Sequence, residues 1–246
     1  MESVRIQSLL DKLAPSNALE PVSSKKIDRV VIDDSVPSAT LNKMYINRYN
    51  NNGAGYSDEA LKQHTTYYEG LSILERNSYL NISNLPLWKA SSSKAGNPIE
   101  NVLNNDCDTF WQSDGGQPHK VDIYFSKRVE IVLLAMYLSI RADESYTPKI
   151  IHVYVGHSPS DAVYYKTLEI RCINGWLGLT FEDNRDDGLL KCQFIRFVFP
   201  HNHENGKDTH LRAMRIYTPT GKKTMEDTML GHSAVTDHMF PGFSIR

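Results

Sequence analysis

The feature that most constrains the fold is a two-residue alternation of apolar and polar side chains, repeated in short segments of the second half of the chain. It runs through Val121–Phe125, Ile151–Val155 and Gln193–Phe199, and a period of two is typical of β-strands that bury one face. Turn signals separate the segments, among them Asp114-Gly115-Gly116, Thr147-Pro148, Asn174-Gly175 and Asp187-Gly188. Short strands with frequent turns predict an all-β fold, either an antiparallel sandwich or a barrel.

The chain divides into three predicted regions. Residues 1–80 are expected to form a polar N-terminal extension, 81–220 the β-domain, and 221–246 a tail of low periodicity. Apolar residues at helical spacing predict a short helix over Ile6–Leu13, which would either cap the main domain or dock on a partner, and a second helix over Gln63–Tyr79. The apolar face of the second helix would hold Tyr67, Leu71 and Leu74. We therefore expect the extension to be partly helical and partly disordered.

Charge and hydropathy argue against two classes of partner. Lys and Arg total 27 against 29 for Asp and Glu, so the net charge of -2 gives no general attraction to nucleic acid or to an anionic membrane. The longest apolar run, Ile131–Ile140, is far shorter than the ~20 residues of a membrane-spanning helix. Glu2 and Arg5 leave no continuous apolar stretch at the N-terminus, so we expect no secretory signal.

The three cysteines, Cys107, Cys172 and Cys192, form no C-x-x-C pair. An odd number at wide spacing favours free thiols in a reducing compartment over a disulfide framework. The same spacing argues against a cysteine-based zinc site. We expect neither a metal nor a cofactor.

A histidine-rich stretch follows the predicted strand Gln193–Phe199. His201, His203 and His210 could ligate the metal of a metal-dependent hydrolase, because imidazole is a common metal ligand. Their spacing lacks the helical i,i+4 geometry of zinc motifs. The Asn-Gly pair in this stretch instead fits a tight exposed loop with a positive φ at Gly206. Such a loop can present amides, a carboxylate and an imidazole to a polar ligand or peptide.

Two further segments carry side chains of interest. Asp143–Thr147 follows the apolar run and precedes Pro148, so it is predicted to be a loop that offers carboxylates and hydroxyls. Phe110 and Trp111 are expected to anchor the core of the sheet. The sequence contains neither G-x-G-x-x-G nor G-x-x-x-x-G-K-[ST], so nucleotide-binding chemistry has no support.

These motifs occur together in an order that resembles a known family. Similarity to the Doc-domain family of anaphase-promoting complex subunits is carried by Phe110–His119, Asp143–Pro148, Asn205–His210, Ile216–Pro219 and the terminal Ile245-Arg246. The long polar extension resembles that of a fungal version of the family.

The resemblance implies a galactose-binding-like jelly roll, which is an antiparallel β-sandwich, and a protein that is not an enzyme. It implies a subunit of a mitotic ubiquitin ligase that acts with the WD40 coactivator as co-receptor for destruction-box degrons and promotes processive ubiquitination. The implied location is the nucleus and cytoplasm. The tail ending in Ile245-Arg246 would dock on a TPR scaffold subunit, and other subunits of the complex would be further partners. The implied degron-binding residues are Ser145, Tyr146, Asn205, Gly206, Asp208, Thr209 and His210.

The alternative function is a module that binds carbohydrate or another small polar ligand, because the same sandwich often hosts sugar sites and fold alone does not fix function. Sugar sites usually offer exposed aromatic rings. The strand-like contexts of Trp88, Trp111 and Trp176 predict instead that these rings are buried, which would favour the ligase subunit.

Overall fold

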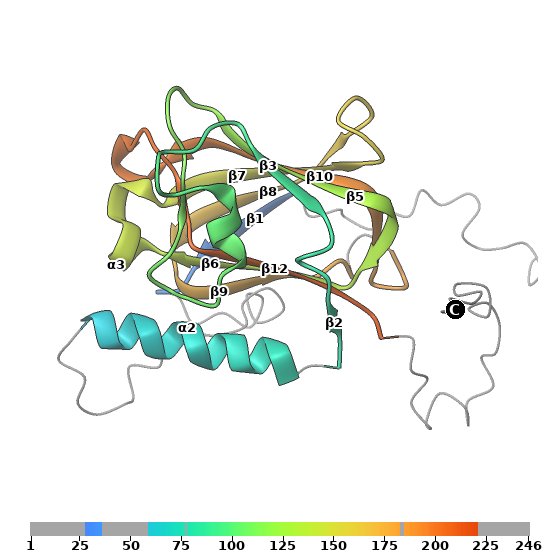
Figure 1. Ribbon diagram of the computed structural model, residues 1–246, viewed down its shortest axis with the longest axis horizontal. Helices are drawn as coiled ribbons and strands as arrows, with labels where there is room; N and C mark the ends of the chain where they lie inside the picture. Colours follow the sequence, from blue (N-terminus) through green and yellow to red (C-terminus); the bar gives the residue numbers. More distant parts are fainter. Residues whose placement is uncertain (1–27, 36–58, 77, 183–184, 221–246) are drawn as a thin grey trace, which may run out of the picture.

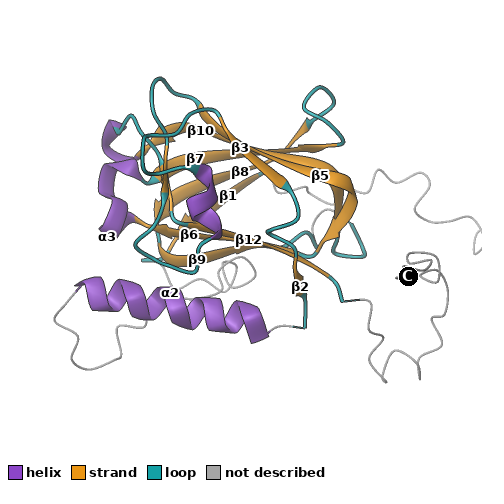
Figure 2. Ribbon diagram, in the orientation of Figure 1, coloured by secondary structure: helices purple, strands orange, loops and turns teal. Residues whose placement is uncertain are grey.

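The computed structural model describes residues 28–35, 59–76, 78–182 and 185–220, and these form two β-sheets stacked face to face with a helix against one of them (Figures 1 and 2). The predicted helix over Ile6–Leu13 and the terminal Ile245-Arg246 lie outside the described residues. The predicted β-sandwich is confirmed.

The larger sheet has six strands. Their spatial order is β1 (Arg29–Asp33), β8 (Val163–Cys172), β7 (Pro148–Gly156), β10 (Leu190–Asn202), β5 (His119–Ile131) and β3 (Leu87–Ala90). All neighbours are antiparallel except β1 and β8, which run parallel at one edge. The strands predicted from alternation fall within β5, β7 and β10, so those three predictions are confirmed.

The smaller sheet has four antiparallel strands, and a separate two-stranded ribbon lies beside it. The sheet has the order β2 (Leu80–Asn81), β12 (Ala213–Thr218), β6 (Leu133–Ser139) and β9 (Asn174–Leu179). The ribbon pairs β4 (Trp111–Gln112) with β11 (His210–Leu211). Short helical turns occupy the connections: η2 (Ile99–Leu103), α3 (Ile140–Asp143), η3 (Glu144–Tyr146) and η4 (His203–Asn205).

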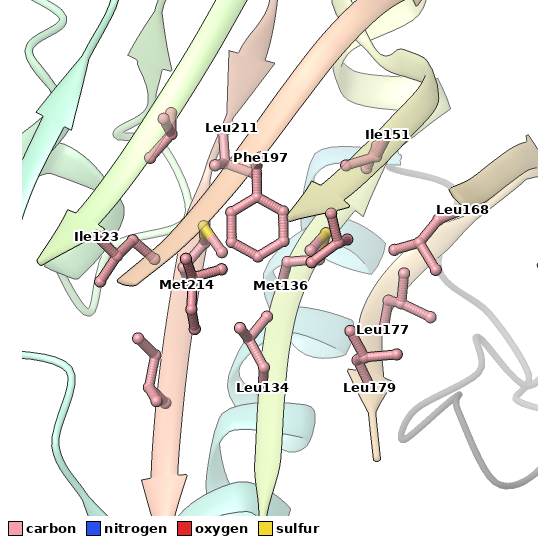
Figure 3. Packing of buried hydrophobic residues seen from close by; sticks show 14 of the residues in the cluster. Ile123, Leu134, Met136, Ile151, Leu168, Leu177, Leu179, Phe197, Leu211 and Met214 are labelled. Carbon is pink, nitrogen blue, oxygen red and sulfur yellow. The ribbon is translucent and has the colours of Figure 1, made fainter. Parts of the chain in front are cut away.

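The hydrophobic core fills the space between the two sheets. In β10 the alternation places Ile195, Phe197 and Phe199 on the inner face, where each is almost completely buried. Figure 3 shows Phe197 facing Met136 and Met214, which belong to the opposite sheet. Burial of one such side chain stabilises the folded chain by about 1.5–3 kcal/mol, so this interior holds the two sheets together.

Helix α2 (Glu59–Arg76) covers the outer face of the smaller sheet (Figure 1). The predicted helix over Gln63–Tyr79 therefore exists, and Tyr67, Leu71 and Leu74 are buried as expected. The ring of Tyr67 lies 5.3 Å from that of Trp176 in β9, whose indole N–H donates to the Tyr67 carbonyl at 2.9 Å. The helix and β1 both come from the predicted extension, yet both pack on the sandwich; the boundary at residue 80 stays a prediction.

The tryptophans are structural. Trp88, Trp111 and Trp176 are buried, as predicted. The indole N–H groups of Trp88 and Trp111 donate to the carbonyls of Ser83 and Ser92 at 2.9 and 3.0 Å. Each ring is therefore held by packing and by a satisfied hydrogen bond, and none offers the open face on which a sugar would stack.

The described helices include none with both the length and the apolar composition of a membrane span. The cysteines are free, with Cys107 and Cys192 buried and Cys172 half-buried. Burial raises the pKa of the Cys192 thiol to about 12, so this thiol stays protonated and unreactive at neutral pH.

Candidate functional site

Two loops meet at one end of the sandwich, the end where Figure 1 shows α3. One runs from α3 through η3 and connects β6 to β7, and the other contains η4 and connects β10 to β11. The backbone N–H of His203 in the second loop donates to the carbonyl of Thr147 in the first at 3.0 Å. The structure thus brings together the two predicted loop segments, although about 60 residues of sequence separate them.

Gly206 is the point of closest approach between the loops. A Cβ atom at this position would lie 1.9 Å from the Ser145 carbonyl oxygen, so no larger residue fits without movement of the backbone. The prediction of a positive φ at Gly206 is wrong, because its φ is -57°. The preceding Glu204 and Asn205 take the left-handed conformation instead, with φ of 50° and 58°. Glycine is needed here for space and not for its conformational freedom.

Backbone strain is concentrated in the same two loops. Within the described part of the chain, the non-glycine residues with positive φ are Glu144, Glu204 and Asn205. Such conformations cost on the order of 1–3 kcal/mol each and persist where the surrounding structure enforces them, often at functional sites. The backbone at Glu144 and Asn205 is therefore held in place by the structure of the two loops.

A buried polar latch fixes the second loop. Asn202 donates through Nδ2 to the carbonyls of Gly206 and Asp208, and its Oδ1 accepts from the Thr209 hydroxyl at 3.0 Å. The backbone of Thr209 makes two hydrogen bonds with Ser113. The Thr209 N–H donates to the Ser113 hydroxyl, and the Thr209 carbonyl accepts from the Ser113 N–H. Thr209 is fully buried. Its place is therefore inside the latch, where it positions the loop, and not on the surface that a ligand would touch.

His210 is held at the centre of a stack of three rings. Phe110 lies on one side and Tyr146 on the other, each with its centroid 4.2 Å from that of His210. The His210 Nδ1 donates to Asp143 at 2.9 Å, and Asp143 also accepts hydrogen bonds from Nε and Nη2 of Arg212, each at 2.8 Å. This buried network fixes the orientation of the imidazole.

The position of Phe110 corrects a prediction. It was expected in the sheet core, but it is half-buried and stacks on His210, while its neighbour Trp111 points into the core. Successive residues of an extended chain face opposite sides, so the two rings cannot share one environment. Phe110 is therefore part of the site.

The surface of the site is formed by the remaining predicted residues. Tyr146 and Asn205 are exposed, while Ser145 and Asp208 are half-buried with room to interact. Asp208 accepts a hydrogen bond at 3.4 Å from Gln112 of β4. This surface offers an aromatic ring, an amide, a hydroxyl and a carboxylate, which suits hydrogen bonding to an extended polar peptide.

Sequence reasoning missed the residues that support this surface. Asp143 was interpreted only as a loop carboxylate, and no separate role was assigned to Arg212 or to Gln112 and His119 of the Phe110–His119 motif. His119 donates through Nε2 to the Lys207 carbonyl at 2.7 Å. Arg212 stands between the apolar residues Leu211 and Ala213, directly before β12, and that context was the one available signal for a buried charge with a partner.

The three histidines considered as metal ligands do not converge. His201 is exposed, His203 is half-buried with its pKa lowered by burial, and His210 is held by Asp143 between the two rings. Among the residues that the structure describes, the one group of His, Cys, Asp or Glu whose ligand atoms all lie within 4.8 Å is formed by His64, Cys107 and Asp108, and it contains none of these three.

A comparison with known protein families and sequences finds similar proteins. The family model described as anaphase-promoting complex, subunit 10 (APC10) matches residues 57–240. Anaphase-promoting complex subunit DOC1 of Saccharomyces cerevisiae is 48% identical over 232 residues, which cover 90% of each chain. Anaphase-promoting complex subunit 10 of Schizosaccharomyces pombe is 40% identical over 57% of this chain and 75% of its own.

Solved structures give the fold. The CBM32-1 and CBM32-2 domains of Clostridium perfringens ZmpB superpose with a TM-score of 0.50 at 18% identity, covering 61% of this chain and 38% of that one. At this identity the likeness concerns architecture alone, and it agrees with the predicted jelly roll.

Proposed function

This chain belongs to the anaphase-promoting complex subunit 10 family, and we propose that within that complex it acts with the WD40 coactivator as a co-receptor for destruction-box degrons. In this role it increases the number of ubiquitins added while a substrate stays bound. It contributes binding surface and performs no catalytic step. Its place of action is the nucleus and cytoplasm.

The observation that carries the proposal is the pair of interlocked loops. The backbone has positive φ at Glu144 and Asn205, and Gly206 packs tightly against the Ser145 carbonyl. These features hold the backbone of the surface residues in place. Preorganised donors and acceptors reduce the entropy lost when a flexible peptide binds. The exposed ring of Tyr146 adds apolar area beside the polar groups. A short degron, which is extended and offers its backbone, is a ligand of this kind.

The contacts and burial of His210 also fit a protein that binds a ligand and does not catalyse a reaction. Its Nδ1 is committed to Asp143, its two ring faces are covered by Phe110 and Tyr146, and its Nε2 is buried. A general acid or base must reach the proton that it transfers. His210 in this arrangement therefore supports the site as a rigid spacer. The alternative of a sugar-binding module is not favoured, because the tryptophans are buried.

The proposal is tested by the double substitution Asn205→Ala/Asp208→Ala in the full chain, assembled into the complex with its coactivator. We expect fewer ubiquitins per substrate-binding event and a loss of the difference between a substrate with its destruction box and one with the box mutated. Neither side chain is buried, so the variant should fold and enter the complex, with a local loss of about 1 kcal/mol from alanine in the left-handed conformation of residue 205.

A matched control is Asn84→Ala, which removes an exposed amide between β2 and β3, away from the two loops. It should leave processivity at the wild-type level. Wild-type processivity in the Asn205/Asp208 variant, with normal incorporation, would remove these residues from the degron site.

We further propose that Ile245-Arg246, which lie outside the described residues, dock on the TPR scaffold subunit. The apolar side chain of Ile245 and the guanidinium of Arg246 can be captured together by a groove. Deletion of both residues should reduce co-purification with the scaffold. The same deletion should not alter the thermal unfolding of the free protein, and undiminished co-purification would contradict this docking mode.

A further inference from the structure

A mixed group of potential metal ligands joins helix α2 to the sandwich. His64 is a half-buried residue of the helix, and Cys107 and Asp108 come from the connection between η2 and β4. The His64 Nε2 lies 3.3 Å from one carboxylate oxygen of Asp108, and the Cys107 Sγ lies 3.7 Å from the other. All three ligand atoms can be chosen within 4.8 Å of one another. Arg212 connects the Cys107 carbonyl with Asp143, the partner of His210, and the group contains no residue proposed to bind a degron.

The His64–Asp108 separation of 3.3 Å equals that between neighbouring ligands of a tetrahedral zinc ion, and the Cys107–Asp108 separation of 3.7 Å, measured to the other carboxylate oxygen, is slightly longer. Zinc bonds of about 2.0 Å to nitrogen or oxygen and about 2.3 Å to sulfur, at tetrahedral angles, place neighbouring ligand atoms about 3.3–3.5 Å apart. Imidazole, thiolate and carboxylate are also the ligand types that zinc prefers. The side chains of His64 and Asp108 are 41% and 66% exposed, so the fourth position opens to solvent and can hold a water molecule.

We propose that His64, Cys107 and Asp108 form a zinc site that clips helix α2 to the η2–β4 connection. The site needs no C-x-x-C motif, because its ligands are assembled by the packing of the helix. It is independent of the role proposed in degron recognition, although the two regions touch. Arg212, which holds Asp143 beside His210, donates through Nη1 to the Cys107 carbonyl at 2.6 Å. A metal that fixes Cys107 therefore also fixes one anchor of the ring stack.

The charges around the thiol are mixed, because the Asp106 and Asp108 carboxylates favour a cation and the Arg212 guanidinium, which donates to the Cys107 carbonyl, disfavours one. Cys107 is buried and stands beside Asp108 and Asp106; burial first, and then these two carboxylates, raise the pKa of its thiol to about 11. Zinc must displace the thiol proton when it binds sulfur. The nearby carboxylates offset part of the positive charge of the ion.

The test uses the full chain, freed of metal with a chelator and titrated with zinc chloride by calorimetry. We expect saturable binding of one zinc per chain and an increase in Tm of a few degrees at saturation. Cobalt in place of zinc should produce the absorption band of a thiolate–cobalt bond. His64→Ala and Asp108→Asn should each weaken binding by at least about tenfold and remove most of the metal-dependent increase in Tm.

Three controls isolate the site. Cys172→Ser removes a half-buried thiol, His157→Ala removes an exposed imidazole, and Asp114→Asn removes an exposed carboxylate. All three residues lie outside the proposed site, so these variants should bind zinc as the wild type does. Cys107→Ser should lose the cobalt–thiolate band. If burial of Cys107 makes that variant unstable, His64→Ala and Asp108→Asn decide, because neither of these side chains is buried. Absence of saturable binding, or undiminished binding in His64→Ala, overturns the proposal.

Discussion

Arg212 is a buried cation whose donors reach two separate parts of the structure. Nε and Nη2 bind Asp143, and Nη1 binds the carbonyl of Cys107. Asp143 in turn accepts from His210, so one guanidinium fixes both the imidazole and the connection before β4. The guanidinium also lies over the Phe110 ring, with Cζ 5.2 Å from its centroid. None of these contacts could be predicted from the sequence, because Asp143 and Arg212 are 69 residues apart.

Replacement of Arg212 by methionine tests this network. Arg212→Met leaves the Asp143 carboxylate buried without its cation, and breaking a buried ion pair in this way costs about 3–5 kcal/mol. Arg212→Lys keeps the charge but not the bidentate geometry, so we expect a smaller loss of about 1–3 kcal/mol. Both values can be measured by urea unfolding.

A suitable comparison is Arg171→Met on the surface of β8. Arg171 pairs with Glu169, but its side chain is 58% exposed, and exposed pairs contribute at most about 1 kcal/mol. If Arg212→Met lowered the free energy of unfolding no more than Arg171→Met does, the buried network would have no special importance for the fold.

At the scale of elements, the site depends on how tightly η3 and η4 pack. The sequence indicated both loops and most of their exposed residues, because polar runs after apolar strands are local patterns. It could not show that Gly206 faces the Ser145 carbonyl, since this contact depends on how β6, β7 and β10 are arranged. An Asn-Gly pair usually places its glycine at positive φ, and here close contact with the other loop determines its conformation instead.

Gly206→Ala measures the importance of this contact. The added methyl group would lie within 2 Å of the Ser145 carbonyl oxygen, so the loops must separate. We expect a loss of about 1–3 kcal/mol in unfolding free energy, as for other overpacked sites, and weaker degron-dependent ubiquitination.

The control for this change is Gly116→Ala. A Cβ atom at Gly116 meets nothing within 4 Å, and its φ is not positive. The stability and activity of the Gly116→Ala variant should therefore remain near those of the wild type. Equal effects of the two glycine substitutions would mean that the loop contact does not determine the shape of the site.

Local pattern also explains which strands were predicted. Val121–Phe125, Ile151–Val155 and Gln193–Phe199 alternate clearly, because each has one face in the core. β1 was missed, since Arg29–Asp33 is a short segment in polar surroundings and its partner strand begins at Val163. Only the paired backbone, from Arg29 opposite Thr167 onward, shows that this segment is part of the sheet.

At the scale of the whole molecule, segments that are distant in sequence complete both sides of the sandwich. β1 extends one edge of the larger sheet, and α2 covers the outer face of the smaller one (Figure 1). The jelly roll was predictable from alternation and resemblance together. The attachment of α2 through Tyr67 and Trp176 was not, because an amphipathic helix shows which of its faces is buried but not which surface covers it.

The parallel pairing of β1 with β8 has a consequence for the order in which the molecule is assembled during synthesis. Residues of β1 leave the ribosome more than 130 residues before those of β8, and α2 leaves well before β9, against which it packs. Chains lengthen by about 5–20 residues per second, so both early segments wait several seconds for their partners. The parts of the sandwich that are made first can therefore pack only after most of its strands have been made.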